Sequence, residues 1–340
     1  MKAVEVRSDG SVAVVERPVP ALGAGDALLR PLASGICGSD LLGWYAARKA
    51  GSILGHEVAG EIVDLGRDVR AFQKGDLVVP HHHAPCLSCE ACRARRYVHC
   101  TAWRSSALDP GGMAELIRIP AANLDRDTHR VPEGLSAEEA SWTEPLATVV
   151  KALRRAQWKP GMSLLVIGLG SAGQLAVRMA RAHGAARIAG TDRVAFRLDL
   201  ARQAGAATFD ADARSLVEAS RDLSEGRGFD VVFVGPGKGE VIRAAASAVA
   251  AGGVLLLFTM APPEESLTLS PHDIYFREVS VVPSYSCGPD ETREALGLIA
   301  ARTVAVADLV THRFPISRAE EAFARARDPN GSVKVMLTFP

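Results

Sequence analysis

The sequence predicts an α/β protein of two domains, one rich in β-strands and one built on a doubly wound parallel sheet. The chain of 340 residues exceeds the size at which a single hydrophobic core stops growing. Short apolar runs broken by Gly and Pro fill its first part, up to about residue 145. From there on, strand-like and helical segments alternate, which is typical of βαβ units.

The first part has five strand-like runs separated by turn residues, a spacing that favours an antiparallel barrel or sandwich. These runs are "VAVVERPVP", "DALLRPLASG", "AGEIVDLG", "GDLVVPHHH" and "AELIRIP". In the alternating part we expect strands at 163–170, 187–192, 229–237 and 253–260, with helices between them. The tail, 285–340, has one helical pattern, around "AEEAFARARD", and ends in the strand-like "SVKVMLTF".

The composition excludes several classes of function. With 39 basic and 39 acidic residues the formal net charge is zero, so no overall field attracts nucleic acid or an anionic membrane. The longest apolar run, 252–261, has the length of a strand and not of a spanning helix, and the start shows no signal peptide. We therefore expect a soluble, cytoplasmic protein. In that reducing compartment the six cysteines are metal ligands more readily than disulfides.

A nucleotide site is predicted at "GLGSAG", 168–173, between an expected strand and an expected helix. Gly168 permits a tight turn, Gly170 lets the backbone approach a pyrophosphate, and Gly173 lets the helix pack on the strand. The free N–H groups of Ser171 and Ala172 at the helix start then bind the anion.

An acidic residue completes this nucleotide pattern. Asp192 follows Gly173 by 19 residues, where a carboxylate accepts the ribose hydroxyls of NAD and repels a 2′-phosphate. Arg193, the next residue, could instead pair with such a phosphate. NAD is therefore favoured over NADP, and the alternative stays open.

Four cysteines have the spacing C-x2-C-x2-C-x7-C, which is highly specific for a metal. They are Cys86, Cys89, Cys92 and Cys100. Four thiolates close a tetrahedral zinc shell without an open position, so this zinc stiffens a loop and does not bind substrate. For the preceding His81, His82 and His83, a turn or supporting role is favoured over a histidine-rich metal centre.

A second, open zinc site must then come from other segments. The candidates lie in "CGSD" (37–40), "GHEVAG" (55–60) and "TEPLA" (143–147). Cys37 and His56 supply one soft and one borderline ligand, and Glu57 or Glu144 supplies a carboxylate. Asp40 could orient His56 by accepting its second N–H.

With these motifs, the chain resembles the zinc-dependent medium-chain dehydrogenase/reductase family over essentially its full length. The resemblance implies a GroES-like catalytic domain formed by both ends of the chain, with the Rossmann domain inserted between them. The expected ranges are 1–146, 147–284 and 285–340, with the structural zinc loop at 86–100. It further implies that Arg197 contacts the adenosine ribose and that the chain forms a dimer or tetramer, with the strand-like run 252–260 as one contact.

Within the family, "TEPLA" is similar to the sorbitol, threonine and sugar dehydrogenase branch, and Glu144 there favours polyhydroxylated substrates. The implied reaction is reversible oxidation of a secondary alcohol: zinc lowers the pKa of the hydroxyl, Ser39 accepts its proton, and a hydride passes to the nicotinamide. Many relatives have a histidine where this chain has Leu42, so the route of the proton is open.

The substrate is predicted only by class: a polyol, a sugar, a cyclitol or an aminosugar. Trp44 and Tyr45 follow "CGSD" and are candidates for a wall of the pocket. A threonine-type hydroxy amino acid dehydrogenase is the alternative enzyme. A redox or zinc sensor that binds NADH without turnover is the alternative from another class, supported by the cysteine cluster and by Cys287.

Overall fold

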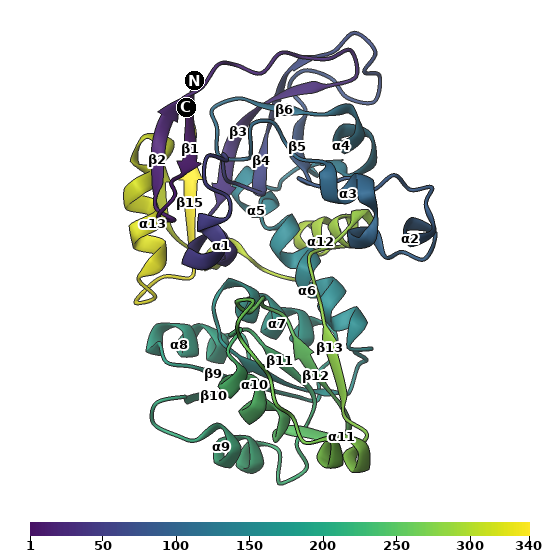
Figure 1. The fold of residues 1–340 in the computed structure, drawn as a ribbon, viewed down its shortest axis with the longest axis vertical. Helices are drawn as coiled ribbons and strands as arrows, with labels where there is room; N and C mark the ends of the chain where they lie inside the picture. The colour runs from purple at the N-terminus through teal and green to yellow at the C-terminus, as the bar shows by residue number, and fades with distance from the viewer. The chain divides into compact units, whose positions relative to one another are not determined.

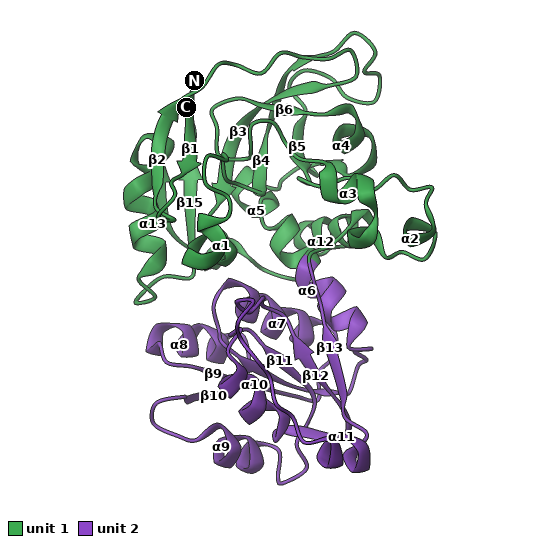
Figure 2. Ribbon diagram, in the orientation of Figure 1, with its two compact units in different colours: residues 1–147, 286–340 green, residues 148–285 purple.

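The computed structural model describes residues 1–340, which divide into two compact units (Figure 2). Unit 1 consists of residues 1–147 and 286–340, and unit 2 of residues 148–285. The first boundary lies inside helix α6 (Thr143–Arg155), and the second directly follows Tyr285. Unit 1 is therefore discontinuous in sequence, because both ends of the chain belong to it.

Unit 2 is built on a parallel sheet of six strands in the order β10-β9-β8-β11-β12-β13 (Figure 1). The chain runs outward from β8 to one edge and then returns to lie beside β8, which is the strand order of a doubly wound nucleotide-binding fold. The strands are β8 (Ser163–Ile167), β9 (Arg187–Asp192), β10 (Ala207–Asp210), β11 (Phe229–Val234), β12 (Val249–Leu257) and β13 (Ser280–Pro283).

Each pair of consecutive strands in unit 2 is joined by a helix, as parallel pairing requires. The helices are α7 (Ser171–Ala182), α8 (Ala195–Gln203), α9 (Leu216–Leu223), α10 (Gly239–Ala246) and α11 (Pro271–Arg277). One apolar core joins the sheet to its covering helices, with Leu165, Val232 and Leu255 fully buried. Short apolar runs without alternation are expected in such strands because both faces are covered.

One expectation for unit 2 needs correction. The strand expected at 253–260 is β12, which begins earlier, at Val249, because α10 already ends at Ala246, and which ends at Leu257. The contact of the run 252–260 with another subunit stays a prediction. Within the sheet, β12 is paired on both sides, with β11 and with β13.

Unit 1 contains a mixed sheet of seven strands in the order β14-β15-β3-β4-β5-β7, with β6 beside β3, and a separate hairpin-like pair, β1 and β2. The long strands β3 and β4 pair antiparallel along nearly their whole length. The strands are β1 (Lys2–Val6), β2 (Val12–Glu16), β3 (Ala27–Gly35), β4 (Glu57–Leu65), β5 (Leu77–Pro80), β6 (Ile117–Ile119), β7 (Thr128–Arg130), β14 (Val310–Pro315) and β15 (Lys334–Thr338).

Helices in unit 1 are mostly short, and in Figure 1 α13 lies beside β1 and β2. They are α1 (Gly43–Ala47), α2 (Glu90–Arg93), α3 (Thr101–Ser105), α4 (Ala121–Arg126), α5 (Ala137–Ala140), α12 (Pro289–Ala300) and α13 (Ala319–Arg327), with 3-10 turns η1 (Gly38–Leu41), η2 (Tyr97–His99), η3 (Ala307–Leu309) and η4 (Ile316–Arg318). The expectation of a single helix after residue 285 is wrong, since α12 is a second one. No helix of the structure is long and apolar enough to cross a membrane.

Candidate zinc and nucleotide sites

One end of the large sheet of unit 1 gathers residues that are far apart in sequence. β3 ends at Gly35, whose antiparallel partner is Glu57, the first residue of β4. Because one strand of an antiparallel pair ends where the other begins, Cys37 and His56 meet just beyond that pair. The register of β3 and β4 is thus what assembles the predicted ligands.

The donor atoms of Cys37, His56 and Glu57 lie within 4.8 Å of one another. A thiolate, an imidazole and a carboxylate are the donor types that zinc takes, and three protein donors leave a fourth position open. Although burial lowers it, the charges of Cys37 and Asp40 hold the pKa of His56 well above its usual value. These surroundings favour positive charge, which fits a cation site.

Glu57 also forms a buried ion pair that the sequence does not reveal. Its Oε2 lies 2.5 Å from Nζ of Lys334, and both side chains are almost completely buried. The same ammonium donates to the carbonyl oxygen of Ile36 at 3.3 Å and lies 5.0 Å from the ring centroid of Trp142. A cation bound by Glu57 therefore shares this carboxylate with a lysine from the last strand.

Glu144 lies in the first turn of α6 and is buried, with 8% exposure. Burial raises the pKa of its carboxyl group; the charge of His56 opposes this rise, and that of Glu57 adds to it. Its donor oxygen groups with His81 and His82, again within 4.8 Å. The structure thus brings three of the four predicted ligands together and places Glu144 in a neighbouring group.

Ser39 and Asp40 lie in the turn η1 that follows Cys37. The hydroxyl of Ser39 donates to the sulfur of Cys37 at 3.2 Å, which leaves its oxygen lone pairs available. Asp40 is fully buried, but its Oδ2 is 3.9 Å from Nδ1 of His56, and its Oδ1 faces Lys49 at 3.5 Å. The expected hydrogen bond to His56 is therefore not formed, and Asp40 acts on that ring through its charge.

The three histidines after β5 have different surroundings. Nδ1 of His81 is 2.7 Å from Oδ2 of Asp127, whereas His83 bonds the carbonyl oxygen of Ser106 at 2.8 Å. Burial, with the neighbouring rings, lowers the pKa of His83 to about 4 and that of His82 well below its usual value.

His81 and His82 group with Glu144, which goes beyond the turn or supporting role predicted for these histidines. Their position follows from strand pairing, which the sequence alone does not give. β5 is antiparallel to β4, so the residues that follow β5 arrive at the sheet end where β4 begins.

The four cysteines of the 86–100 loop converge as their spacing predicts. All four sulfur atoms lie within 4.8 Å of one another. The sulfur of Cys92 is 3.9 Å from that of Cys86 and 3.5 Å from that of Cys89. Four sulfurs at zinc distance form a tetrahedron with edges of about 3.8 Å, so the cluster fits a closed zinc shell.

The glycine motif in unit 2 adopts the geometry expected of a nucleotide turn. Gly168 follows β8 with φ of 87°, a left-handed conformation that favours glycine. Gly170 is the N-cap of α7, and a Cβ there meets nothing closer than Arg197 at 4.0 Å. A Cβ on Gly173, by contrast, collides with the carbonyl oxygen of Gly168. Ser171 begins the helix and presents its N-terminal N–H groups at the end of the strand.

Asp192 ends β9 beside this turn. Its carboxylate accepts from the backbone N–H groups of Leu169 at 2.7 Å and of Arg193 at 2.8 Å. The guanidinium of Arg197 lies 4.0 Å away, and the side chain of Arg193 is paired with Asp212 at 3.1 Å. The predicted acidic residue is therefore at the expected strand end, with a fixed carboxylate.

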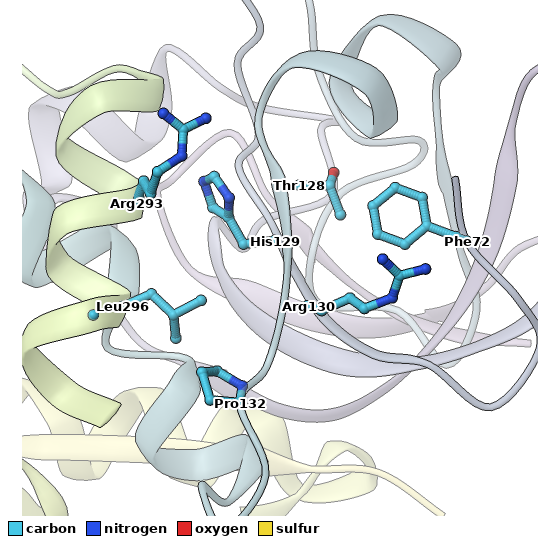
Figure 3. Close-up of a pocket in the computed structure, with 8 residues that line it drawn as sticks. Phe72, Thr128, His129, Arg130, Pro132, Arg293 and Leu296 are labelled. Carbon is cyan, nitrogen blue, oxygen red and sulfur yellow. The ribbon is translucent and has the colours of Figure 1, made fainter. Parts of the chain in front are cut away.

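The predicted aromatic wall does not coincide with a cavity found in unit 1. Trp44 and Tyr45 lie on α1 with ring centroids 5.6 Å apart, and Nζ of Lys49 is 4.5 Å from the Tyr45 ring centroid. The cavity, of about 360 Å³, is shown in Figure 3. None of the predicted site residues lines it. Its lining residues are Phe72, Thr128, His129, Arg130, Pro132, Arg293, Leu296 and Gly297.

Comparisons with known proteins identify the family to which this chain belongs. Residues 23–132 match the family described as "Alcohol dehydrogenase GroES-like domain", and residues 172–301 match the family described as "Zinc-binding dehydrogenase". The chain therefore belongs to the zinc-dependent medium-chain dehydrogenase family of oxidoreductases, with its GroES-like and Rossmann folds. The predicted family and fold class are confirmed.

Particular relatives cover nearly the whole chain. Sorbitol dehydrogenase of Bacillus subtilis (strain 168) is 29% identical over 99% of this chain and 97% of its own length. D-xylulose reductase A of Aspergillus niger is 30% identical over 95% of this chain and 92% of its own length. L-threonine 3-dehydrogenase of Bacillus licheniformis is 30% identical over 91% of this chain and 90% of its own length.

A solved structure extends the likeness to three dimensions. A chain of Sinorhizobium meliloti 1021, described as a zinc-binding dehydrogenase and bound to NADP, has a TM-score of 0.88 and 28% identity, with 99% of this chain and 98% of that chain covered. Zinc-binding dehydrogenases with a bound nicotinamide cofactor are thus among the structural neighbours of this chain.

Proposed function

We propose that this protein oxidises a secondary alcohol of a polyol, sugar, cyclitol or aminosugar-type substrate reversibly to the ketone, with NAD as hydride acceptor. The observation that carries the proposal is the convergence of Cys37, His56 and Glu57 at one end of the unit 1 sheet. Three donors with an open fourth position are typical of catalytic zinc, and a closed set of four is typical of structural zinc.

The chain accordingly holds two zinc ions, one in each group. Cys86, Cys89, Cys92 and Cys100 retain the structural ion. Cys37, His56 and Glu57 would hold the catalytic ion, and Glu57 would share its carboxylate with Lys334. Glu144, in the neighbouring group, is the alternative carboxylate ligand. When bound, the catalytic ion supplies the Lewis acidity that lowers the pKa of an alcohol.

The chain's own residues must then remove the proton of the alcohol. Ser39 is the candidate acceptor, because its hydroxyl is anchored on the sulfur of Cys37 at 3.2 Å and still has lone pairs to offer. Leu42 provides no titratable group for the next step. The proton therefore leaves from Ser39 through the cofactor ribose or water.

NAD is the preferred cofactor of this proposal. Gly168, Gly170 and Gly173 shape the turn, and the N–H groups of Ser171 and Ala172 receive the pyrophosphate. The carboxylate of Asp192 is placed to accept the ribose hydroxyls and to repel a 2′-phosphate, while Arg197 lies beside it. Arg193 forms an exposed ion pair with Asp212 at 3.1 Å, a weak contact that still leaves NADP as the alternative cofactor.

Glu144 favours a polyhydroxylated substrate over a simple alcohol, and two of the relatives act, by name, on sorbitol and on D-xylulose. The threonine dehydrogenase relative keeps a hydroxy amino acid as the second candidate. Trp44 and Tyr45 are the proposed pocket wall. An NAD-reduction screen against polyols, cyclitols, aminosugars and L-threonine, with zinc content measured in parallel, separates these candidates.

Two alanine variants test the reaction itself. Cys37→Ala and His56→Ala should each abolish turnover, because they remove a zinc donor, while NADH binding by unit 2 stays within about twofold of the wild type. Activity that survives removal of the catalytic zinc would refute the mechanism. A protein that binds NADH but reduces no NAD with any substrate would instead be a sensor.

The protein is also proposed to be a homodimer or homotetramer of the cytoplasm. β13 is the edge strand of the unit 2 sheet, paired only with β12, and Val281 on it is 38% exposed. Tyr275 and Phe276 of the preceding helix are exposed as well. An exposed apolar edge of this kind is suited to pairing with a second copy. The cytoplasmic location follows from the need to keep the zinc-binding thiols reduced.

A further inference from the structure

We propose that His81, His82 and Glu144 form a second divalent-cation site beside the Cys37–His56–Glu57 group, built from nitrogen and oxygen donors only. It takes a transition-metal ion in addition to the two zinc ions of the proposed function. The test of this site is a binding measurement, whereas the dehydrogenase proposal is tested by turnover. Either proposal can therefore fail while the other stands.

The geometry of the three donors is that of a metal site. One ligand atom from each residue lies within 4.8 Å of the other two, and the residues come from two different elements. His81 and Glu144 are buried, and His82 is half-buried. The ring centroid of His82 is 5.1 Å from that of His56, so the two donor groups adjoin.

His81 is supported as metal-binding histidines usually are. Its Nδ1 is 2.7 Å from Oδ2 of Asp127, and a carboxylate at one ring nitrogen fixes the tautomer that offers the other to a metal. The sulfur of Cys287 is 3.6 Å from Nε2, and a thiol is a weak partner that a cation can displace.

His82 gives an independent indication. Its Nδ1 is buried and has no hydrogen-bond partner in the structure. A buried polar atom without a hydrogen-bond partner costs about 1–3 kcal/mol of folding free energy. A ligand bound to this nitrogen would offset that cost. An edge-to-face contact with His81 and a tilted contact with His83 explain the position of this imidazole but not the missing hydrogen bond.

The donor types determine which metal ions bind at this site and how binding affects the enzyme. Two imidazoles and one carboxylate suit Zn²⁺, Co²⁺ or Ni²⁺, and without a thiolate the site is weaker than either cysteine-containing group. His82 of this site adjoins His56 of the catalytic group, with ring centroids 5.1 Å apart. An ion held here adds positive charge beside the catalytic ion, so occupancy of the new site should inhibit the enzyme reversibly.

The test is a cobalt titration of the enzyme that already holds its two zinc ions. Wild-type protein should bind one further Co²⁺ per chain, with weak d–d absorbance and no thiolate-to-cobalt charge transfer in the near ultraviolet. His82→Phe keeps the ring volume and removes both nitrogens. It should weaken this binding by about a hundredfold, the upper end of the loss seen for metal-site partners.

His83→Phe is the matched control, because His83 is adjacent, stacks on Trp103 and is outside the donor set. It should bind the additional ion like the wild type. NADH affinity and the circular dichroism of each variant report whether it is folded. The proposal is overturned if the wild type takes no further ion at millimolar cobalt, if His82→Phe binds it as tightly as His83→Phe, or if the new absorbance contains sulfur charge transfer.

Discussion

The second and third glycines of the nucleotide turn, Gly170 and Gly173, should respond differently when each is replaced by alanine. At Gly173, a Cβ falls well inside 3.0 Å of the Gly168 carbonyl oxygen and 3.3 Å from Cγ1 of Val166. The turn and helix α7 must then separate, an overpacking that costs about 1–3 kcal/mol. Alanine regains up to about 1 kcal/mol of helix propensity. Because the collision is with a backbone atom, the upper part of the overpacking range applies, and the net change is a loss of roughly 1–2 kcal/mol.

At Gly170 the same substitution has room. The backbone there has φ of −68°, which any residue adopts, and the nearest atom to a Cβ is Nη1 of Arg197 at 4.0 Å. Gly170→Ala should therefore leave the stability of unit 2 unchanged. The methyl group instead occupies the space through which the backbone approaches a pyrophosphate, so NADH affinity should fall by at least about tenfold, or ~1.4 kcal/mol.

Differential scanning calorimetry and NADH fluorescence titration measure the two effects separately. For Gly173→Ala, a loss of this size lowers the melting temperature of a domain like unit 2 by about 3–8 °C. The reasoning is wrong if Gly173→Ala melts at or above the wild-type temperature. It is equally wrong if Gly170→Ala destabilises the protein as much as Gly173→Ala does, or binds NADH normally.

Three further outcomes are expected. Asp26 is buried, which raises its pKa, yet the N–H of Gly23, the guanidinium of Arg118 and the N–H of Ala121 lower it overall. Asp26→Asn should thus cost about 2 kcal/mol at neutral pH, a difference that urea titrations should show shrinking as pH falls below the ordinary Asp pKa. Cys89→Ser should lower the melting temperature and should reduce the zinc content by one ion per chain. The kcat per folded chain should change less. Val281→Lys should shift the oligomer toward monomer in light scattering, and an unchanged mass would exclude the β13 edge as the interface.

The parts of the site that the sequence could predict are those coded locally. The Gly168–Gly173 turn, the four-cysteine loop and the Asp192 position each depend on residues within one segment or one βαβ unit. Their chemistry follows from spacing alone. The doubly wound strand order could be expected too, because parallel strands need crossing helices and the connections have one hand.

The remaining features arise from pairing over long distances. Lys334 reaches Glu57 across 277 positions of the chain, and no local pattern distinguishes it from any other lysine in a strand. The grouping of His82 with Glu144 depends on strand register in the same way. α12 was missed for a different reason: it begins at Pro289 after an irregular segment, and its buried face includes the polar Glu291 and Thr292, which shortens the apolar pattern.

The discontinuity of unit 1 has a consequence for synthesis on the ribosome. Unit 2 is continuous and can fold as soon as its last strand emerges, since domains generally fold as units during translation. β3 and β4, by contrast, wait for β15, which pairs with β3 and carries the ammonium that neutralises Glu57. A nascent chain stalled before its final residues thus holds beside Cys37 and His56 a carboxylate that still lacks its lysine partner.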